Sequence, residues 1–401
     1  MIKGKLLLYY NDLVFQPSAI FLEKDFGQVP FVISTLYNYD LEYIISTNSI
    51  NKDFISFKSK SVLQFEKQFK FLSAKIDFLK ILKIYYHLYK NRNQYTALVF
   101  FPFVPLSDYI FLKLFKYFNK KSVIYLKLDA NIDMINKLEF SYKNENRSVS
   151  KYFRTYFHYK KLLENSDLIS FETKEVGEKL KNNFLGCKGL SNKIINVFNG
   201  VSEKSILDFK INILEYDKKE NIVLIIGRHG TIEKNTELVF KATQHLNTDW
   251  KFIFLGPVED SFLEVINIYK NKVSNFDEKY IFKGLIANKK EYFNYLNKSK
   301  ILLLTSNKEG FPMVFPEALY FTNYIITTDV SGSSEATRNN ELGIIYKKND
   351  YLELESHLKK LFDNPDILKE YIDDIRRYSR NYFVWEKSLG QSAFQKLFRN
   401  K

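Results

Sequence analysis

The sequence predicts an α/β protein made of two doubly wound, Rossmann-like domains that face each other across a cleft. The chain has 401 residues, which is more than one domain usually needs. Short apolar runs, typical of buried parallel strands, alternate with segments of helical periodicity. This alternation occurs twice, before and after residues 202–219, which we interpret as a linker. We therefore place the first domain at residues 1–201 and the second at residues 202–384.

Composition excludes several classes of protein. Hydrophobic residues make up 45% and charged residues 26% of the chain, as in globular proteins. A single cysteine, Cys187, excludes a disulfide framework and fits a reducing compartment. The N-terminal apolar run is too short for a signal peptide or a membrane span. We expect a cytoplasmic protein, or one bound to the inner face of the plasma membrane.

The net charge of +14 is concentrated in the first half of the chain. Residues 1–200 hold 30 Lys and Arg against 18 Asp and Glu, a net charge of +12, which leaves +2 for residues 201–401. An electropositive first domain favours an anionic partner such as phospholipid, nucleic acid or a phosphorylated substrate.

The first domain contains two candidate site residues. Its predicted strands are residues 5–10, 43–47, 96–101, 123–126, 167–171 and 193–198, and its predicted helices are 27–36, 107–118, 151–164 and 173–182. Gly27 stands at a strand-to-helix turn, where backbone can approach a ligand phosphate, although it can also be a plain turn residue. Asp129 follows the strand at 123–126, and polar residues there reach the ligand crevice of a parallel sheet. Asp129 can equally cap the next turn.

Residues 52–92 combine basic and aromatic side chains. They hold ten Lys and Arg but only three acidic residues. The spacing of Phe65, Phe69 and Leu72, and then of Ile76, Leu79 and Leu82, is helical. A basic amphipathic helix can bind an anionic membrane surface. The same pattern also fits a surface helix with its apolar face in the core, and the two interpretations are compatible.

The second domain begins with a strand, residues 222–226, that ends at Gly227-Arg228. Lys234 follows at the expected start of a helix. Two cations near the end of a buried strand can stabilise a diphosphate as it departs with negative charge. Arginine binds phosphate through two N–H groups, and lysine acts as a point charge. Further strands are expected at 251–255 and 280–282, and the second is followed by Gly284 and Leu285.

Residues 301–350 contain the most informative pattern. A strand at 301–304, a polar turn at 305–310, a helix with Pro312 and Pro316 near its first turn, and a strand at 324–327 form one βαβ unit. Glu309 lies at the mouth of the sheet, and Glu317 follows eight residues later, about two helical turns on. Free N–H groups of the turn and helix start favour an anion: Gly310, Phe311, Met313 and Val314. Carboxylates beside an anion site suit a ligand with both hydroxyls and phosphates, such as a nucleotide-sugar.

These segments resemble the retaining glycosyltransferases of family 4, which have the GT-B fold. EGFPMVFPEAL, followed by IITTDVSGSSE, is similar to the family's Glu-x7-Glu signature, and GRHGTIEKN is similar to its phosphate-binding pair. The resemblance implies that Glu309 contacts the sugar, Arg228 and Lys234 the diphosphate, Glu317 the ribose, and Gly284-Leu285 the nucleobase. It also implies that Gly27 faces the donor, and that residues 385–401 return to the first domain. Where many members have a histidine, this chain offers Asp129, which we interpret as a contact to the acceptor hydroxyl.

We therefore predict an enzyme that transfers a sugar, with retention, from a UDP- or GDP-linked donor to a saccharide acceptor. The basic first domain suggests a lipid-linked acceptor in bacterial capsule or lipopolysaccharide synthesis. The five histidines are scattered and no Asp-x-Asp follows a predicted strand, so we expect neither metal nor cofactor, and the nucleotide-sugar is a substrate. Two alternatives remain: a basic protein that binds single-stranded nucleic acid, and a catalytically idle GT-B scaffold that binds nucleotide. Our main interpretation includes no nucleic-acid partner and leaves the oligomeric state open.

Overall fold

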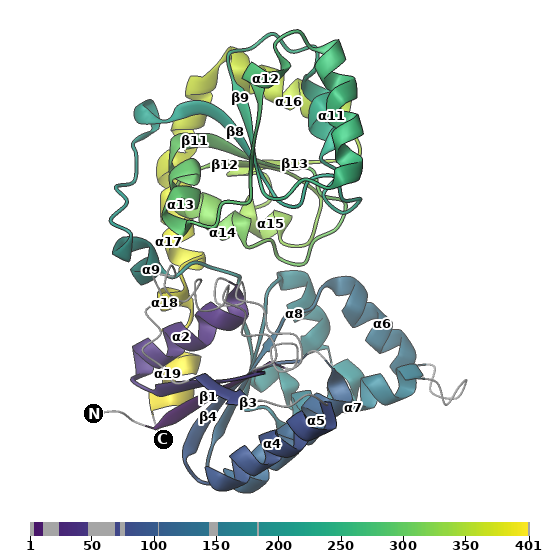
Figure 1. The fold of residues 1–401 in the computed structure, drawn as a ribbon. Coiled ribbons are helices and arrows are strands. Elements are labelled where there is room, and N and C mark those ends of the chain that lie inside the picture. Colours follow the sequence, from purple (N-terminus) through teal and green to yellow (C-terminus); the bar gives the residue numbers. More distant parts are fainter. Residues whose placement is uncertain are drawn as a thin grey trace. The chain divides into compact units, whose positions relative to one another are not determined.

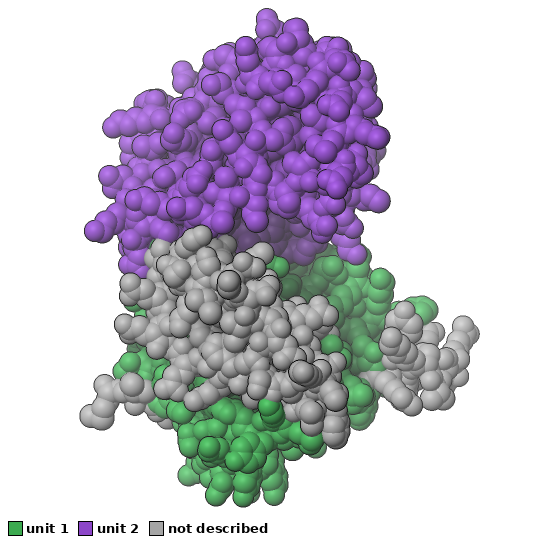
Figure 2. Space-filling view, in the orientation of Figure 1, with its two compact units in different colours: residues 1–205, 385–401 green, residues 206–384 purple. Residues whose placement is uncertain are grey.

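The chain divides into two compact units. A computed structural model describes residues 4–10, 24–46, 69–72, 77–102, 104–143, 151–182 and 184–399. The N-terminal unit contains residues 1–205 and 385–401, and the C-terminal unit contains residues 206–384 (Figure 2). The chain thus enters the C-terminal unit after Ser205 and returns to the N-terminal unit at Trp385.

The N-terminal unit is built on a sheet of seven parallel strands in the order β3-β2-β1-β4-β5-β6-β7. This is the doubly wound order, in which the strand sequence reverses between β1 and β4. The strands are β1 (Lys5–Tyr10), β2 (Asp40–Ser46), β3 (Phe69–Leu72), β4 (Tyr95–Phe101), β5 (Val123–Leu128), β6 (Leu168–Phe171) and β7 (Ile194–Asn196).

Helices cover both faces of this sheet (Figure 1), and an apolar cluster lies between the sheet and the helices on each face. One face packs against α2 (Asp25–Tyr37), α18 (Trp385–Ser388) and α19 (Ser392–Arg399). The other face is covered by α4 (Asp77–Lys90), α5 (Pro105–Phe118), α6 (Ile132–Lys143), α7 (Lys151–Asn165) and α8 (Lys174–Lys181). The C-terminal tail is therefore part of the core of the N-terminal unit: Trp385, Leu389, Phe394 and Phe398 are all fully buried.

The C-terminal unit repeats the plan with six parallel strands in the order β10-β9-β8-β11-β12-β13. They are β8 (Glu220–Ile226), β9 (Lys251–Leu255), β10 (Tyr280–Gly284), β11 (Ser299–Leu304), β12 (Tyr324–Thr328) and β13 (Gly343–Tyr346). The strand sequence again reverses, here between β8 and β11. The predicted fold class, two doubly wound α/β domains, is confirmed.

Two groups of helices enclose the second sheet (Figure 1). One group contains α10 (Glu237–Thr243), α11 (Asp260–Lys272), α12 (Phe276–Lys279) and α16 (Tyr351–Asp363). Phe240 of α10 packs against aromatic rings of α11 and α12, and also against Phe254 of β9. The other group contains α13 (Lys289–Lys298), α14 (Val314–Tyr320) and α17 (Ile372–Tyr382). A short helix α15 (Ser333–Ala336) precedes β13.

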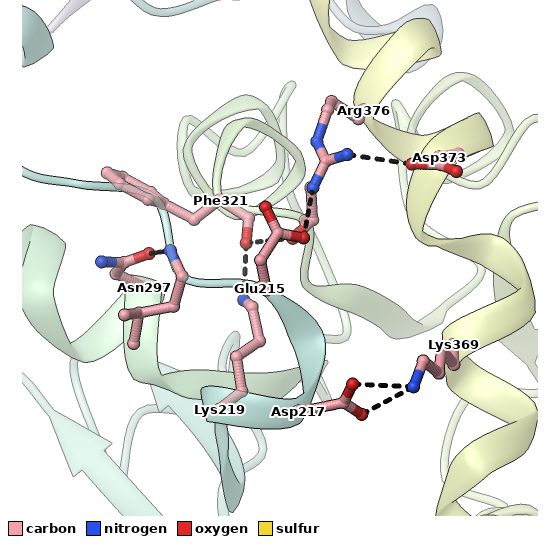
Figure 3. A network of polar contacts seen from close by, with 10 residues as sticks. Glu215, Asp217, Lys219, Asn297, Phe321, Lys369, Asp373 and Arg376 are labelled. Atoms are coloured by element: carbon pink, nitrogen blue, oxygen red, sulfur yellow. Dashed lines mark hydrogen bonds and ion pairs between the residues drawn. The ribbon is translucent and has the colours of Figure 1, made fainter.

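A buried lysine, Lys219, lies at the edge of the second sheet where its strands begin (Figure 3). Lys219 directly precedes β8, and its Nζ donates to the carbonyls of Ser299 at 3.0 Å and Phe321 at 2.6 Å. The ammonium therefore ties together the segments that lead into β8, β11 and β12. Around it, surface pairs such as Asp217–Lys369 join the segment before β8 to the segment before α17.

Two predictions about local structure were wrong. Residues 69–72 form strand β3, which pairs with β2, although their spacing suggested a helix; the phenylalanines of Phe-Lys-Phe-Leu suit an edge strand equally well. The rest of the predicted helix before residue 77 lies outside the described residues. The second concerns the position of Glu317. Helix α14 begins at Val314, so Glu317 lies one turn into it and not two.

Candidate functional site

The loops that follow β8, β9 and β10 meet at the carboxyl edge of the C-terminal sheet. The Gly227 N–H donates to the Leu255 carbonyl at 2.9 Å, and the Gly256 N–H donates to the Gly284 carbonyl at 2.8 Å. The adjacent loop after β11 carries Glu309. In doubly wound sheets, ligands bind at this edge, next to the point where the strand order reverses. The carboxyl edge around β8 and β11 is therefore the candidate site.

Lys234 and Glu309 form the centre of this site. The Lys234 ammonium lies 2.5 Å from Glu309 Oε1, which also accepts a hydrogen bond from the Ser306 hydroxyl at 2.6 Å. Two hydrogen bonds join the two loops: the Thr305 side-chain Oγ1 donates to the Lys234 carbonyl at 2.8 Å, and the Asn307 N–H donates to the Glu233 carbonyl at 2.7 Å. These bonds hold the loops that carry the ion pair.

Lys234 is a loop residue, which corrects the prediction that it starts a helix. Helix α10 begins at Glu237, and the Lys234 N–H instead donates to Thr231 Oγ1 at 3.3 Å. Gly227 makes room for the lysine stem, because a Cβ at Gly227 would lie 3.1 Å from Lys234 Cε. A bulkier residue at the end of β8 would displace the ammonium from Glu309.

Arg228 does not join Lys234 and Glu309. Its Nε forms an ion pair with Glu259 Oε1, from the loop before α11. The arginine side chain is 65% exposed, so the guanidinium can turn toward a ligand if it releases Glu259. The predicted pair of cations thus comes from one loop, but each cation is paired with a different carboxylate.

His229 is a buried structural residue. The Nε2 atom lies 3.1 Å from the Leu255 carbonyl, and Nδ1 lies 3.4 Å from Thr236 Oγ1. This fits a neutral ring with a proton on Nε2, and burial lowers the pKa of His229 to about 4. Two hydrogen bonds therefore fix the ring.

Glu317 is buried, and both of its carboxylate oxygens have partners on α13. The Lys289 ammonium lies 2.9 Å from Oε1, and the Tyr292 hydroxyl donates to Oε2 at 2.5 Å. The sequence did not single out Lys289 or Tyr292, because neither belongs to a recognisable motif.

Gly284 ends β10 in a left-handed conformation, with φ of +66°, which favours glycine. Among the described residues, no atom lies within 4 Å of the position that its Cβ would take, so this turn is open there. The next residue, Leu285, is 69% exposed. An exposed apolar side chain beside an open glycine turn can receive a flat ring.

The segment from Gly310 to Val314 leads into α14, and its residues differ in how far they are exposed to solvent. Gly310 is exposed and Met313 half-buried. Phe311 and Val314 are buried, and Phe311 packs so closely on Gly332 that a Cβ there would lie 2.8 Å from the ring. The side chain of Phe311 therefore belongs to the core, and only its backbone remains for the predicted anion contact.

Asp129 belongs to an acidic cluster in the N-terminal unit. It directly follows β5 and is exposed, and its carboxyl lies near that of Glu172. The ammonium of Lys127 pairs with Glu172 and also contacts Asp25 Oδ2 at 2.7 Å and Asn199 Oδ1 at 3.1 Å. The side chains of Asp25, Lys127, Glu172 and Asn199 are all buried. Burial raises the pKa of Glu172 well above its usual value, and the Lys127 ammonium opposes this shift.

Gly27 lies within the first turn of α2, and not in the preceding loop. Its N–H donates to the Lys24 carbonyl at 3.1 Å, and its own carbonyl accepts from the Tyr43 hydroxyl at 3.1 Å. Gly27 and Asp129 thus belong to the N-terminal unit, whereas Arg228, Lys234, Glu309 and Glu317 belong to the C-terminal unit.

Residues 208–381 match the family model of the glycosyl transferases group 1. This match covers almost the whole C-terminal unit, including every candidate residue in it. Three curated relatives are similar over part of the chain. An uncharacterized glycosyltransferase from Methanocaldococcus jannaschii is 24% identical over 236 residues, 58% of this chain and 60% of its own length.

The second relative is a Campylobacter jejuni N-acetyl-D-galactosaminyltransferase, named for a diphospho-undecaprenol-linked saccharide, 29% identical over 172 residues. These residues are 42% of this chain and 45% of the relative. The third, the Staphylococcus aureus capsular polysaccharide biosynthesis glycosyltransferase CapM, is 25% identical over 203 residues, 47% of this chain and 51% of the relative. The chain thus spans less than two thirds of the length of each of these relatives.

Solved structures resemble the whole chain. A glycosyltransferase from Rickettsia africae has a TM-score of 0.68 at 14% identity and covers 100% of both chains. Anabaena HepE, solved in complex with UDP and glucose, has a TM-score of 0.62 at 10% identity and covers 99% of this chain and 98% of its own. At these identities the likeness shows the fold, which this chain shares with GT-B glycosyltransferases.

Proposed function

We propose that the protein is a glycosyltransferase that moves a sugar from a nucleotide-sugar to a hydroxyl group of a saccharide acceptor. The observation that carries this proposal is the Lys234–Glu309 ion pair at the carboxyl edge of the C-terminal sheet, inside the segment that matches the family model. A carboxylate beside a lysine and an exposed arginine suits a ligand that presents hydroxyls and a diphosphate together.

The proposed reaction retains the configuration of the sugar. The bond between the anomeric carbon and the diphosphate oxygen breaks, and its electron pair leaves with the diphosphate. The acceptor oxygen forms the new bond on the same face, and its proton passes to the departing phosphate. Glu309 positions sugar hydroxyls and supports the positive charge that develops on the ring.

Lys234 and Arg228 take up the negative charge on the leaving group. Fixed cations stabilise the transition state more than the ground state, because the charge on the diphosphate grows as the bond breaks. Helix α14 has seven residues, so we assign most of this stabilisation to the two side chains and a smaller part to the N–H groups near Met313 and Val314. Cationic side chains can supply the charge that a metal ion provides elsewhere.

The nucleoside is assigned to the other end of the candidate site. Glu317 accepts hydrogen bonds from the ribose, and the Gly284–Leu285 turn receives the nucleobase. The open space at Gly284 and the exposure of Leu285 support this assignment. Either UDP or GDP satisfies these contacts.

Among the described residues, no group of three or more His, Cys, Asp and Glu side chains is arranged to hold a metal ion. Independence from metals and cofactors therefore stays a prediction, which activity in the presence of a chelator would test.

We propose further that the acceptor is a saccharide carried on a lipid, as the name of the Campylobacter relative states for that enzyme. Within the described ranges, no helix is long and apolar enough to cross a membrane. Helices α4 and α5 instead expose two stripes of apolar side chains at helical spacing: Leu82, Tyr86 and Tyr89 on α4, and Leu106, Ile110 and Tyr117 on α5. We call this surface the α4–α5 face.

Lysines flank both stripes of the α4–α5 face, including Lys83, Lys90 and Lys113, which are all exposed. The two helices contact each other, with the rings of Tyr89 and Phe118 5.9 Å apart. Exposed aromatic rings among lysines fit an anionic bilayer, since each basic residue near it contributes about 1 kcal/mol. This surface supports a peripheral enzyme of bacterial capsule or lipopolysaccharide synthesis, working at the inner face of the plasma membrane.

One experiment tests the enzymatic proposal. A panel of UDP- and GDP-sugars, each mixed with a lipid-linked saccharide, is assayed for release of nucleoside diphosphate by the parent and by Glu309→Gln. We expect release by the parent with at least one donor, and a loss of about 10²-fold or more in the variant. Equal release by both proteins would overturn the role of Glu309. Nucleotide binding without release from any donor would favour the idle scaffold.

Flotation with vesicles tests the membrane proposal. We expect recovery with vesicles that contain anionic lipid, and reduced recovery for Tyr86→Ser combined with Tyr89→Ser. Tyr351→Ser, an exposed tyrosine on α16, is the matched control. Equal recovery with neutral and anionic vesicles would rule out this surface, and tight, salt-dependent binding to single-stranded nucleic acid would support the alternative.

A further inference from the structure

Glu317 is held more firmly than the other acidic residues of the candidate site. Its side chain is only 6% exposed, and its two oxygens have different partners. The Lys289 ammonium lies 2.9 Å from Oε1, and the Tyr292 hydroxyl lies 2.5 Å from Oε2. The rotation of the carboxylate about its axis is therefore fixed at both oxygens.

The local sequence explains why α13 presents both partners. Asn288 caps the helix, and its Oδ1 accepts from the N–H groups of Lys290 and Glu291. Positions 289 and 292 are three residues apart and share one side of the helix. The Lys289 ammonium also lies 4.3 Å from the centre of the Tyr292 ring, a cation–π contact that further restricts both side chains.

This arrangement leaves half of the acceptor capacity of the carboxylate available. An ionised carboxylate has about four lone-pair positions, and the two contacts from α13 use two of them. The remaining positions, one on each oxygen, suit two neighbouring hydroxyl groups. Lys289 also offsets the negative charge of Glu317, which would otherwise repel a nucleotide whose diphosphate binds nearby.

We propose that Lys289 and Tyr292 are positioning residues that orient Glu317 to bind both ribose hydroxyls, which makes the site selective for ribonucleotides. This inference rests on the proposed function, since it assumes that a nucleoside diphosphate binds at this edge of the sheet. It assigns roles to two residues outside the Glu-x7-Glu segment. A purely structural tie between α13 and α14 would support the fold but would not distinguish a ribose from a deoxyribose.

Calorimetric titration separates these two roles. The parent and five variants are titrated with UDP and GDP, and with the 2′,3′-dideoxy form of each. The first two variants are Tyr292→Phe and Lys289→Met. The controls make the same changes at neighbouring positions of the same helix: Tyr295→Phe and Lys290→Met. Lys289→Arg, which keeps the charge, serves as the conservative variant.

For the nucleotide that binds, we expect the parent to prefer the ribose form by about 10- to 100-fold, since two hydrogen bonds to a charged group are lost in the dideoxy form. Tyr292→Phe and Lys289→Met reduce this ratio at least about 5-fold, and Lys289→Arg restores part of it. The two control variants keep the parental ratio.

The outcomes distinguish the inference from the proposal on which it rests. If both nucleotide forms weaken equally in Tyr292→Phe and Lys289→Met, the residues are structural and the inference is wrong while the proposed function stands. The inference is also wrong, and the proposed function still stands, if the parent binds the ribose and dideoxyribose forms equally well. If neither UDP nor GDP binds to the parent, the proposed function fails and the inference fails with it.

Discussion

The ammonium of Lys234 lies 2.5 Å from the carboxylate of Glu309, although the two residues belong to loops that follow different strands. Their strands, β8 and β11, are neighbours in the sheet, and the hydrogen bond from the Thr305 hydroxyl to the Lys234 carbonyl joins the two loops. When a diphosphate binds, the same ammonium can serve both the carboxylate and a phosphate oxygen. The ion pair therefore holds the Lys234 ammonium at the place where we expect the diphosphate leaving group.

Replacement of this cation is expected to slow transfer more than it weakens binding. Lys234→Met lowers kcat by about 10²- to 10³-fold, the usual effect of removing one group that stabilises transition-state charge. The donor dissociation constant rises much less, because the charge on the bound diphosphate is smaller before the bond breaks. Steady-state kinetics of nucleoside diphosphate release measures both. Lys241→Met, on α10, is the control, and an unchanged kcat in Lys234→Met would contradict the role.

Release of Arg228 from its carboxylate is expected to tighten nucleotide binding. Glu259→Gln removes the partner of Arg228, which then no longer has to exchange one anion for another. Because exposed ion pairs contribute at most about 1 kcal/mol, we expect a dissociation constant up to about 5-fold lower for UDP or GDP. The difference in dissociation constant between the parent and Glu259→Gln should become smaller at high salt. Calorimetry checks it, with Glu264→Gln on α11 as control; weaker binding in Glu259→Gln would show that the glutamate itself contacts the ligand.

The sequence predicted the sheets because their strands are buried on both faces. Runs such as residues 301–304 and 123–126 contain almost only large apolar residues, and this leaves few alternatives to a central parallel strand. Residues 69–72 were assigned wrongly because Phe-Lys-Phe-Leu satisfies both the helical and the alternating pattern. Pairing with β2 decides between them, and local periodicity carries no information about pairing.

The partners of the predicted side chains were missed for a related reason. Glu259 meets Arg228, and Lys289 meets Glu317, only because the sheet brings together the ends of strands that are distant in sequence. The motif identified Glu317 but not the tyrosine and lysine that hold it. Lys127, near the end of the otherwise apolar strand β5, was a signal of the acidic cluster around Asp25 and Glu172, since a buried lysine needs partners.

Loss of Lys127 is expected to destabilise the N-terminal unit strongly. Lys127→Met leaves the buried carboxylates of Asp25 and Glu172 without their cation, which typically costs about 3–5 kcal/mol. Lys116→Met provides the comparison, since Lys116 is 35% exposed and lies 3.9 Å from Asp167, and we expect it to cost less than about 1 kcal/mol. Urea denaturation of both variants measures the difference. If Lys127→Met unfolds at the parental urea concentration, the carboxylates do not depend on the lysine.

Because of Lys219, at the amino edge of the C-terminal sheet, we expect the free energy of unfolding to depend on pH. Burial lowers the pKa of Lys219 to about 7, and the charges of Arg376 and Lys300 act in the same direction. In the unfolded chain the pKa of a lysine is about 10.4. Between these two values the unfolded chain binds a proton that the folded chain lacks, so the free energy of unfolding rises with pH from about 7 to about 10. Below pH 7 both states carry the proton, and this contribution disappears.

Substitution of Lys219 should therefore remove part of the pH dependence. The parent is expected to gain on the order of 4 kcal/mol between pH 7 and pH 10 from this one group, and Lys219→Met is expected to lose that gain. Lys218→Met, the exposed neighbour, should keep the parental slope. Urea denaturation at several pH values gives the slope of the free energy of unfolding against pH. Lys219→Met also leaves the Ser299 and Phe321 carbonyls without a donor, but this cost is the same at every pH and does not change the slope. Identical slopes for the parent and Lys219→Met would mean that Lys219 remains protonated in the folded protein, stabilised by those two carbonyls more than burial destabilises it.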